Sequence, residues 1–350
     1  MSFTQLLLYP LSLLYNLITS IRNWAYNKNL RGAVKFETNV ISIGNLEVGG
    51  TGKTPFTEYL IKEFKENHKI AVLSRGYMRK SIGFRIINES DNAETAGDEP
   101  FQIYLKFKKH ITVAVSKERE TAIPFILAER PEIDLFLLDD AFQYRTVKPS
   151  FSIVLSRFQR PFYNDLVMPS GRLREKRSNI KRADVVIITK CPEGLKDIEK
   201  DQIQKEIQKY TEKPVFFTTL KYAEPIQLGT QQNLPKQIIL VTGIAHTDQL
   251  ESYVAGFWNV AKHYKYPDHQ HYTLPQIEEV NSQFGNQLQN GELGILLTEK
   301  DAVKWMDRNL RKVWENWPVF YLPVETVFLE NESKFLELTR NSIKEYSVEE

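Results

Sequence analysis

Short runs of apolar residues, many of them β-branched, alternate along the chain with longer stretches of helical periodicity. The runs "NVISI", "KIAVLS", "ITVAV", "LFLLDD", "FSIVLS" and "DVVIIT" end at Ile43, Ser74, Val115, Asp140, Ser156 and Thr189. Runs that are apolar throughout, rather than alternating, are typical of parallel strands buried on both faces. After the first run, Phe56, Leu60 and Phe64 recur at four-residue spacing and predict an amphipathic helix. This alternation predicts an α/β fold with a mainly parallel sheet covered by helices.

The pattern changes around residues 216–236, where "VFFTTLKYAEPIQL" favours extended chain and "GTQQNLPK" a polar turn. A second α/β set follows, with the run "QIILVTG", a helix near Gln249–Lys262 and the run "GILLT". We therefore predict four segments: an N-terminal apolar helix over 1–30, a large core over 31–215, an extended linker over 216–236 and a smaller C-terminal α/β domain over 237–350. Ligands of open α/β sheets bind beyond the carboxyl ends of the strands, so the loops that follow the runs are the candidate site.

The N-terminal segment differs from the rest of the chain. Residues 1–21 carry no charged side chain, and "LLLYPLSLLYNLI" is dense in leucine and tyrosine. Positive charges follow the apolar run, at Arg22, Lys28 and Arg31, whereas a secretory signal has them first. We predict a membrane-associated helix that either spans the bilayer or lies half inserted, because Pro10 and several polar residues dilute the run. A helix packed on the domain behind it is the alternative.

Composition limits the classes of function. The 350-residue chain is 42% hydrophobic and 26% charged, as in an ordinary folded protein. A formal net charge of +2 does not call for nucleic acid as a partner. Cys191 is the single cysteine, so no intramolecular disulfide can form, in keeping with a reducing compartment.

The stretch "GNLEVGGTGKTP" over residues 44–55 is similar to a P-loop. It departs from the strict pattern G-x-x-x-x-G-K-[ST], which needs glycine where Glu47 stands. Its glycines let backbone N–H groups approach an anion, and the following helix N-terminus adds a positive dipole end. Lys53 can reach the β and γ phosphates, and the Thr54 hydroxyl can bind magnesium. A ligand-free turn is the alternative, but the position between a strand and a helix favours phosphate binding and a P-loop NTPase-like core.

Two acidic pairs could complete such a site. In "LFLLDDAFQ", Asp139 and Asp140 stand at the end of an apolar strand, where a Walker-B acid helps to hold magnesium. In "TAGDEPF", Asp98 and Glu99 precede a helical run and could supply a catalytic base for an incoming hydroxyl. Both pairs could instead be turn or cap residues, and for Asp98 and Glu99 the two interpretations stay open.

Two further segments carry candidate groups. "YKYPDHQHYTLP" contains His263, His269 and His271, and a histidine there could assist a base or contact phosphate, or be a solvated loop residue. Residues 172–182 hold six basic side chains against Glu175 alone. Arginines in a loop at the active edge could clamp phosphates, although most charge runs are solvated surface. We interpret Cys191 as structural.

Together these segments resemble the tetraacyldisaccharide 4'-kinase family, the lipid A 4'-kinases of Gram-negative bacteria. The resemblance runs in order along nearly the whole chain, through the apolar N-terminus, "SIGNLEVGGTGKTP", "LSRGYMRK", "AGDEP", "LLDDAFQ", "GRLRE", "KRADVVIITKCP", "VTGIA", "YPDHQHY" and "LLTEKDAVK". It implies transfer of the ATP γ-phosphoryl group to the 4'-hydroxyl of a tetraacylated glucosamine disaccharide 1-phosphate in lipid A biosynthesis. It also implies Mg²⁺ dependence and a location at the cytoplasmic face of the inner membrane. We expect a monomer with no nucleic-acid partner.

The resemblance further implies roles for individual residues. It makes Asp98 the catalytic base, assisted by His269, with Lys53 acting on the phosphates. It assigns Thr54, Asp139 and Asp140 to magnesium. The implied ATP contacts are Gly49, Gly50, Thr51, Gly52, Lys53, Thr54, Pro55, Gln143, Arg174 and Glu175.

Three positions depart from the family pattern. Met78 and Ala141 stand where glycine is common, and Lys176 stands where proline is common. All three affect backbone freedom more than a reacting group.

Two other classes of function remain as alternatives. One is a P-loop switch, but "TKCP" lacks the aspartate of a guanine-binding [NT]-K-x-D loop. The other is a membrane-tethered binding module.

Overall fold

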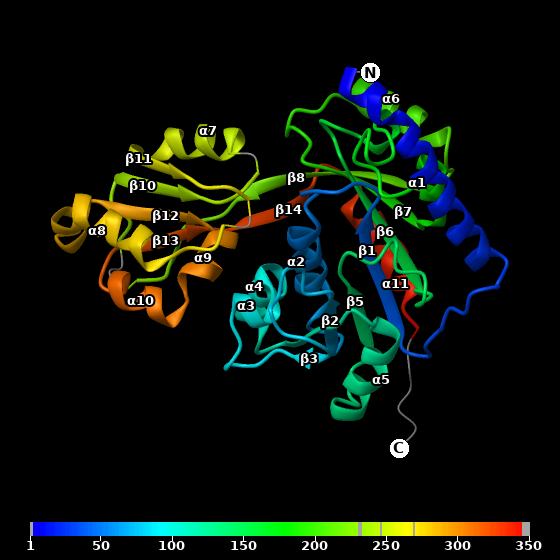
Figure 1. Cartoon of the computed structure of the whole chain (residues 1–350), viewed down its shortest axis with the longest axis horizontal. Coiled ribbons are helices and arrows are strands. Elements are labelled where there is room, and N and C mark those ends of the chain that lie inside the picture. Colours follow the sequence, from blue (N-terminus) through cyan, green and yellow to red (C-terminus); the bar gives the residue numbers. More distant parts are fainter. Residues whose placement is uncertain (1–2, 230–232, 246, 269, 345–350) are drawn as a thin grey trace.

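The computed structural model describes residues 3–229, 233–245, 247–268 and 270–344. These residues form two α/β units that lie side by side, a large unit and a small unit, each built on its own sheet (Figure 1). Two neighbouring strands, β8 (Val215–Tyr222) and β14 (Val324–Phe328), lead from one unit to the other.

The sheet of the large unit has nine strands within the described residues. Their order is β14, β8, β7 (Val185–Thr189), β6 (Phe151–Arg157), β1 (Asn39–Asn45), β5 (Leu135–Leu138), β2 (Ile70–Ser74), β4 (Ile111–Val115) and β3 (Arg85–Ile86). Every neighbouring pair from β8 to β4 is parallel, and the edge strands β14 and β3 pair antiparallel. The predicted α/β fold with a mainly parallel sheet is confirmed.

Alternate residues of these strands enter different cores, so both faces of the sheet are covered. Ile41 and Ile43 of β1 pack in one core with Phe56, whereas Val40 packs in another with Ile123. The first face carries α2 (Lys53–Phe64), α4 (Asp98–Phe107) and α11 (Glu332–Ser342), and the second carries α5 (Arg119–Glu129) and α6 (Asp197–Gln208). The short helices α3 (Ala93–Ala96), η1 (Phe162–Asn164) and η2 (Arg177–Arg182) lie in connections.

The small unit repeats this layering on a smaller scale. Its sheet has the order β11 (Asn259–Lys265), β10 (Gln237–Thr242), β12 (Gly294–Thr298), β13 (Val319–Leu322) and β9 (Ile226–Gln227). One face packs on α8 (Leu274–Gln289), α9 (Glu299–Trp305) and α10 (Arg308–Trp314), and the other on α7 (Asp248–Phe257). The helix predicted near Gln249–Lys262 is wrong in its second half. The helix ends at Phe257 because Trp258 takes extended dihedrals, and the next residues form the edge strand β11.

The chain passes from the large unit to the small unit and then returns to the large one. Residues 216–236 include most of β8, which belongs to the large sheet, and β9, which belongs to the small one. After the small unit, β14 and α11 return to the large unit, where Phe335 is fully buried with its ring centroid 5.7 Å from that of Phe56. Residues 324–342 therefore pack on the large unit, although they fall inside the predicted segment 237–350. The remaining boundaries stay a prediction.

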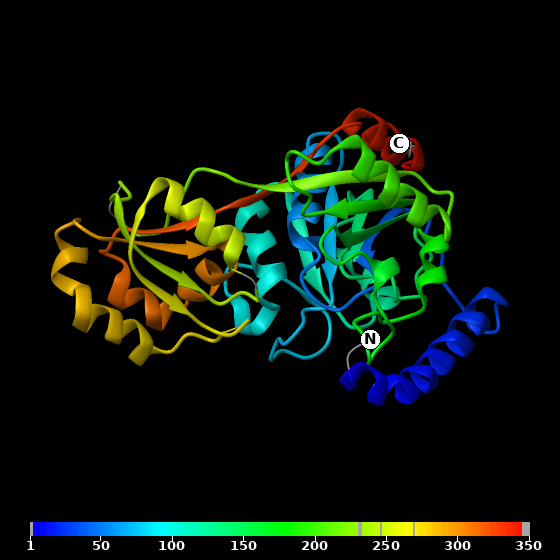
Figure 2. The same cartoon turned by 90° about the horizontal axis from the view of Figure 1, so that it is seen from above.

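Helix α1 (Phe3–Asn27) lies along the outside of the large unit (Figure 1 and Figure 2). Its polar residues Ser12 and Asn23 are buried, at 3% and 4% exposure. Its large apolar side chains are exposed, among them Leu6, Leu7, Leu11, Leu13, Leu14, Leu17, Ile18, Ile21 and Trp24. This is the reverse of an ordinary surface helix, which turns its apolar stripe inward. Within the described residues, no helix combines the length and the hydropathy that a membrane span requires.

Candidate active site

The passage from β1 into α2 requires glycine at two positions, one at the end of the strand and one in the loop. At Gly44, a Cβ atom would lie 2.6 Å from the Cβ atom of Phe142, so only glycine allows this close approach of the two segments. Gly52 precedes α2 with φ of 87°, in the left-handed region that favours glycine. The first turn of α2 then presents its backbone N–H groups and the positive end of the helix dipole. The loop therefore has the build of a phosphate cradle.

Neighbouring strands hold this loop in place. Asn45 Nδ2 donates to Thr51 Oγ1 at 2.9 Å, and Thr189 Oγ1 donates to the Thr51 carbonyl at 2.8 Å. Lys190 follows Thr189 in the chain. Its Nζ lies 4.0 Å from the position that a Cβ atom at Gly50 would occupy. Burial lowers the pKa of Lys190. The cradle thus has a second lysine beside it, in addition to Lys53.

Glu47, which breaks the strict P-loop pattern, has a buried partner. Its carboxylate accepts two hydrogen bonds from the Arg157 guanidinium, from Nε at 3.2 Å and from Nη2 at 2.9 Å. Glu47 is 1% exposed. Beside it, the Arg174 N–H donates to the Leu46 carbonyl at 2.7 Å. The residues that lengthen this loop therefore pair with β6 and with the segment that carries Arg174.

Asp139 lies directly after β5 and is buried, with 2% exposure. Ser74 Oγ donates to its Oδ2 at 3.2 Å, whereas its Oδ1 has no hydrogen-bond partner within the described residues. Burial, followed by repulsion from Glu99 and Asp140, raises the pKa of Asp139 to about 6. Asp139 is thus a buried carboxylate, and one of its oxygen atoms lacks a hydrogen-bond partner in the described part of the chain.

Asp140 has the opposite electrostatic surroundings. Lys53 Nζ lies 3.5 Å from its carboxylate, and Arg174 Nη1 lies 2.8 and 2.9 Å from its two oxygen atoms. Burial acts to raise the pKa of Asp140, but Lys53 and Arg174 together lower it. Arg174 Nη1 also donates to Gln143 Oε1 at 3.2 Å, and Gln143 Nε2 donates to the Asn45 carbonyl at 2.8 Å. Residues predicted separately from the sequence therefore form one connected group at the P-loop.

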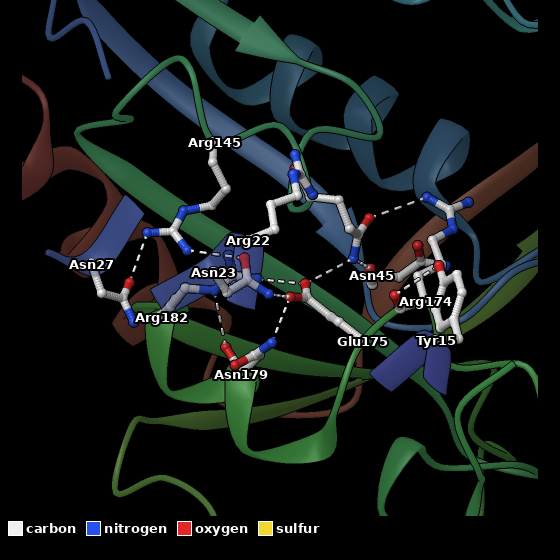
Figure 3. Close-up of polar contacts among 11 residues, drawn as sticks. Tyr15, Arg22, Asn23, Asn27, Asn45, Arg145, Arg174, Glu175, Asn179 and Arg182 are labelled. Carbon is white, nitrogen blue, oxygen red and sulfur yellow. Dashed lines mark hydrogen bonds and ion pairs between the residues drawn. The ribbon is translucent and has the colours of Figure 1, made fainter. Parts of the chain in front are cut away.

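Helix α1 is attached to this group by polar contacts, which Figure 3 shows. Glu175 accepts a hydrogen bond from Asn23 Nδ2 at 2.7 Å and another from Gln143 Nε2 at 3.2 Å. Tyr15 OH donates to the Arg174 carbonyl at 3.1 Å. The polar side of α1 thus contacts the segment whose side chains hold Asp140.

Asp98 is the first residue of α4 and lies where the large unit meets the small unit. Lys304 of α9 places its Nζ 3.2 Å from Asp98 Oδ2, and the two side chains are 4% and 13% exposed. The N-cap position of α4 is Gly97, and Asp98 and Glu99 are the acidic residues of its first turn. His269, the predicted assistant of Asp98, lies outside the described residues.

The acidic edge fits a magnesium ion. Carboxylate oxygens are the ligands that Mg²⁺ prefers, and the buried Asp139 Oδ1 lacks a partner in the described part of the chain. No group of three or more His, Cys, Asp or Glu among the described residues could hold a metal by itself. Such a site suits Mg²⁺, which keeps several waters and binds through one or two carboxylates together with substrate phosphates. Thr54, the third predicted ligand, lies in the first turn of α2.

Besides Lys190, three basic residues of this site were missed in the sequence. Arg119 at the start of α5 is buried and donates through Nη2 to the Asp139 carbonyl, and burial lowers its pKa. Arg157, at the end of β6, holds Glu47, and Lys304 contacts Asp98. Ligands of open α/β sheets bind beyond the carboxyl ends of the strands. Arg119 follows β4 and Arg157 ends β6, so this rule could have found both residues. Lys304 lies in a helix of the other unit and leaves no local signal.

A cavity of about 360 Å³ is lined by residues of β8 and α7 and by the segment that follows β7. Its lining includes Cys191 together with Tyr222 and Tyr253, whose ring centroids are 4.5 Å apart. Cys191 stands two residues after Thr189, whose side chain bonds to the Thr51 carbonyl of the P-loop. Burial raises the pKa of Cys191 to about 12, so its thiol stays protonated at neutral pH.

Comparison with known proteins decides the family. Residues 4–344 match the family described as tetraacyldisaccharide-1-P 4'-kinase. The chain belongs to the tetraacyldisaccharide 4'-kinase family. Members of this family from Flavobacterium psychrophilum and Cytophaga hutchinsonii are 38% and 36% identical to it, over 96% and 98% of this chain and 96% and 97% of theirs. The crystal structure of LpxK from Aquifex aeolicus in complex with ATP superposes with a TM-score of 0.76 at 27% identity, covering 98% of this chain and 100% of that one.

Membership in the tetraacyldisaccharide 4'-kinase family confirms the resemblance inferred from the motifs. It also confirms the fold class, because the superposition extends over both units. It does not by itself test the roles of single residues. For those, the contacts described above are the support.

Proposed function

We propose that this chain transfers the γ-phosphoryl group of ATP to the 4'-hydroxyl of tetraacyldisaccharide 1-phosphate through the residues gathered at its P-loop. The activity follows from the family: the chain is an ATP-dependent kinase of lipid A biosynthesis. One observation carries its assignment to this site. Lys53 of the P-loop lies 3.5 Å from Asp140, which joins the phosphate cradle to the acidic pair at the end of β5.

The cradle is proposed to bind the ATP phosphates through residues 49–55. Lys53 and Arg174 would contact the phosphates, with Gln143 and Glu175 orienting Arg174, because these side chains already form one connected group. Asp139, Asp140 and Thr54 would hold Mg²⁺, which neutralises charge on the phosphates when bound. Positioning and electrostatic stabilisation carry most of the rate in phosphoryl transfer.

Asp98 is the proposed general base, which accepts the proton of the 4'-hydroxyl, with His269 as its assistant. The Asp98→Asn variant keeps the shape of the side chain and removes the base, so we expect kcat to fall roughly 10²- to 10⁴-fold. Binding of ATP should be unchanged. Glu99→Gln is the paired variant, because Glu99 also stands at the start of α4. If Glu99→Gln loses kcat while Asp98→Asn keeps it, the general base is Glu99 and not Asp98.

The cavity beside Cys191 is the proposed site of the nucleotide base. Its Tyr222–Tyr253 pair offers an aromatic face, on which a planar base can stack. Tyr253→Ala should raise the KM for ATP and leave the KM for the lipid acceptor unchanged. Val254 is buried in the same helix and does not line the cavity, so Val254→Ala serves as the control for packing of α7.

The exposed apolar side of α1 is the proposed contact with the membrane. An interfacial helix buries apolar side chains at the acyl boundary, and α1 presents Leu7, Leu14, Ile18 and Ile21 to the outside. We propose that this contact places the site at the cytoplasmic face of the inner membrane, where the acyl chains of the acceptor stay in the bilayer. The monomeric state and the lack of a nucleic-acid partner stay predictions.

The proposed reaction is tested with γ-³²P-labelled ATP and purified tetraacyldisaccharide 1-phosphate in mixed micelles. We expect label in the lipid, and fragmentation of the product in a mass spectrometer should place the new phosphate on the 4' position. Hydrolysis of ATP without labelled lipid would reject the kinase assignment. Equal nucleotide turnover with and without lipid would favour a switch instead.

A further inference from the structure

Three guanidinium groups meet at the C-terminal part of α1. They belong to Arg22 of α1, Arg145 of the connection after β5 and Arg182 of η2, and we call them the arginine cluster (Figure 3). The guanidinium carbons of Arg22 and Arg145 lie 5.7 and 5.3 Å from the ring centroid of Tyr26. These three side chains, from distant parts of the sequence, therefore converge on one place.

The cluster carries more positive charge than its surroundings balance. Glu175 is the carboxylate that bonds to it in the described structure, through Arg182, and it also accepts from Asn179 Nδ2 at 2.6 Å. The acceptors of the other two arginines are neutral. Arg22 Nη2 donates to the Gln143 carbonyl at 2.9 Å. Arg145 donates from Nη1 to Asn23 Oδ1 at 3.2 Å and from Nη2 to Asn27 Oδ1 at 2.9 Å, and both acceptors belong to α1.

Both burial and neighbouring like charges act on Arg145. Burial, followed by repulsion from Arg182, lowers the pKa of Arg145 to about 10. Arg182 Nη1 is buried and has no hydrogen-bond partner among the described residues. A bound anion would relieve the repulsion and satisfy the free N–H groups, because arginine pairs with phosphate through two parallel hydrogen bonds.

The position of the cluster indicates which anion it meets. On one side it adjoins the exposed apolar residues Leu17, Ile21 and Trp24 of α1, which suit acyl chains. On the other side it adjoins the active edge, because Arg145 follows Asp140 in the same connection and Gln143, between them, bonds to Arg174. A ligand that reacts near Asp140 and keeps its acyl chains along α1 would therefore have its remaining polar end at the cluster.

We propose that the arginine cluster binds the 1-phosphate of the lipid acceptor. This proposal rests on the proposed function, in which the acceptor is a disaccharide that reacts at the 4'-hydroxyl and carries a phosphate at its other end. The acceptor named for the family carries this phosphate, and the arginine cluster is the group of residues that would recognise it.

The test compares two acceptors that differ only in the 1-phosphate: tetraacyldisaccharide 1-phosphate and the same lipid without its phosphate. The wild-type enzyme should prefer the phosphorylated acceptor in kcat/KM. For Arg145→Gln we expect kcat/KM to fall roughly ten- to a hundredfold with the phosphorylated acceptor, as for loss of one charge-assisted hydrogen bond, and little with the other. Arg22→Gln should act in the same direction, and its combination with Arg145→Gln should abolish the preference.

Two variants separate recognition from structure. Asn27→Ala removes an acceptor of Arg145 on α1 but leaves all three arginine charges, so the preference should persist. Arg145→Lys keeps the charge without the planar fork and should restore part of the preference. If Arg145→Gln slows both acceptors equally, or if Asn27→Ala has the same effect, the arginines only attach α1 and the proposal is overturned.

A further measurement distinguishes the acceptor phosphate from the phosphates of ordinary membrane lipids. Binding of wild type and Arg22→Gln/Arg145→Gln is measured on vesicles of phosphatidylcholine, with and without phosphatidylglycerol. On each kind of vesicle, we expect the variant to bind as strongly as the wild type. Loss of binding to the anionic vesicles together with an unchanged preference between the two acceptors would assign the cluster to lipid headgroups and overturn the proposal. Failure of the wild type to phosphorylate either acceptor would instead reject the proposed function.

Discussion

Lys304 of the small unit contacts Asp98 of the large unit, with 3.2 Å between Nζ and Oδ2. Both side chains are largely buried, and Lys304 is 6% exposed as a whole residue. A buried lysine beside a carboxylate keeps that carboxylate in place, because either charge alone would be costly to bury. The small unit thereby contributes a group to the start of α4, where the proposed base stands.

The first prediction follows from this contact. We expect Lys304→Met to lower kcat by about tenfold or more, since a base that is no longer held in position acts less often in the productive geometry. The KM for ATP should stay unchanged. The measurement is steady-state kinetics at saturating lipid, with the melting temperature recorded for each protein.

Lys62→Met is the control for this prediction. It removes another ion pair that joins α2 to β14, between Lys62 and Glu325, without touching Asp98. Its kcat should match that of the wild type. A Lys304→Met enzyme with full kcat would show that the contact has no part in positioning Asp98.

The second prediction concerns the buried pair of Glu47 and Arg157. Removing one partner leaves an uncompensated charge in the interior, so Glu47→Gln or Arg157→Met should each cost about 3 to 5 kcal/mol in the free energy of unfolding. The double variant Glu47→Gln/Arg157→Met should cost less than the sum of the two, because it leaves neither charge alone. Urea unfolding curves of the four proteins give the coupling energy. Additive effects would contradict the inferred pairing.

The third prediction concerns the close approach at Gly44. A methyl group there would lie 2.6 Å from Phe142 Cβ and 2.7 Å from its backbone nitrogen, so Gly44→Ala must push the two segments apart. We expect a loss of about 1 to 3 kcal/mol in stability, as for an overpacked core, together with weaker ATP binding. Gly32→Ala is the control, because a Cβ at Gly32 meets no atom within 4 Å. Calorimetric titration with ATP and thermal unfolding measure the two effects.

The fourth prediction is a pH dependence that arises from Glu58 of α2. Lys106 of α4 bonds to the carboxylates of both Glu58 and Glu299. Burial, followed by repulsion from Glu299, raises the pKa of Glu58 from 4.5 to about 7. The folded protein therefore holds a proton on Glu58 more tightly than the unfolded chain does. The resulting stabilisation is complete below the unfolded pKa and is lost as the pH rises through the folded one.

We accordingly expect the free energy of unfolding of the wild type, relative to Glu58→Gln, to decrease between about pH 5 and about pH 8. Urea titrations of both proteins across this range provide the measurement. Titrating groups that contact neither Glu58 nor Lys106 contribute to both proteins and cancel in the difference. A difference that does not vary with pH would show that Glu58 titrates in its ordinary range.

The fold could be predicted because its strands are local in the sequence. Six apolar runs gave six of the parallel strands, and the glycine-rich loop lies between a strand and a helix as expected. The edge strand β11 was missed, because residues 259–265 are largely exposed and lack the apolar run of a buried strand. Met78, noted as a departure from glycine, does take a φ of 59°, so the departure marks a real backbone constraint.

The contacts of the site could be predicted only in part. Lys53, Asp140 and Arg174 belong to recognisable motifs, and the structure brings them together. The partners of Glu47 and Asp98 could not be found, because Arg157 and Lys304 lie far away in the sequence and pair only in the folded chain. The same holds for Asn23, which bonds to Glu175 across 152 positions and gives α1 its buried polar side.

The return of the chain through β14 and α11 has a consequence for synthesis on the ribosome. The small unit is translated before these two elements, yet Phe335 of α11 closes the core over Phe56, next to the P-loop. At about 5 to 20 residues per second, the newly made large unit must wait many seconds with this apolar surface uncovered. Helix α2, which follows the P-loop and carries Phe56, is thus among the first parts to be made and among the last to be protected from aggregation.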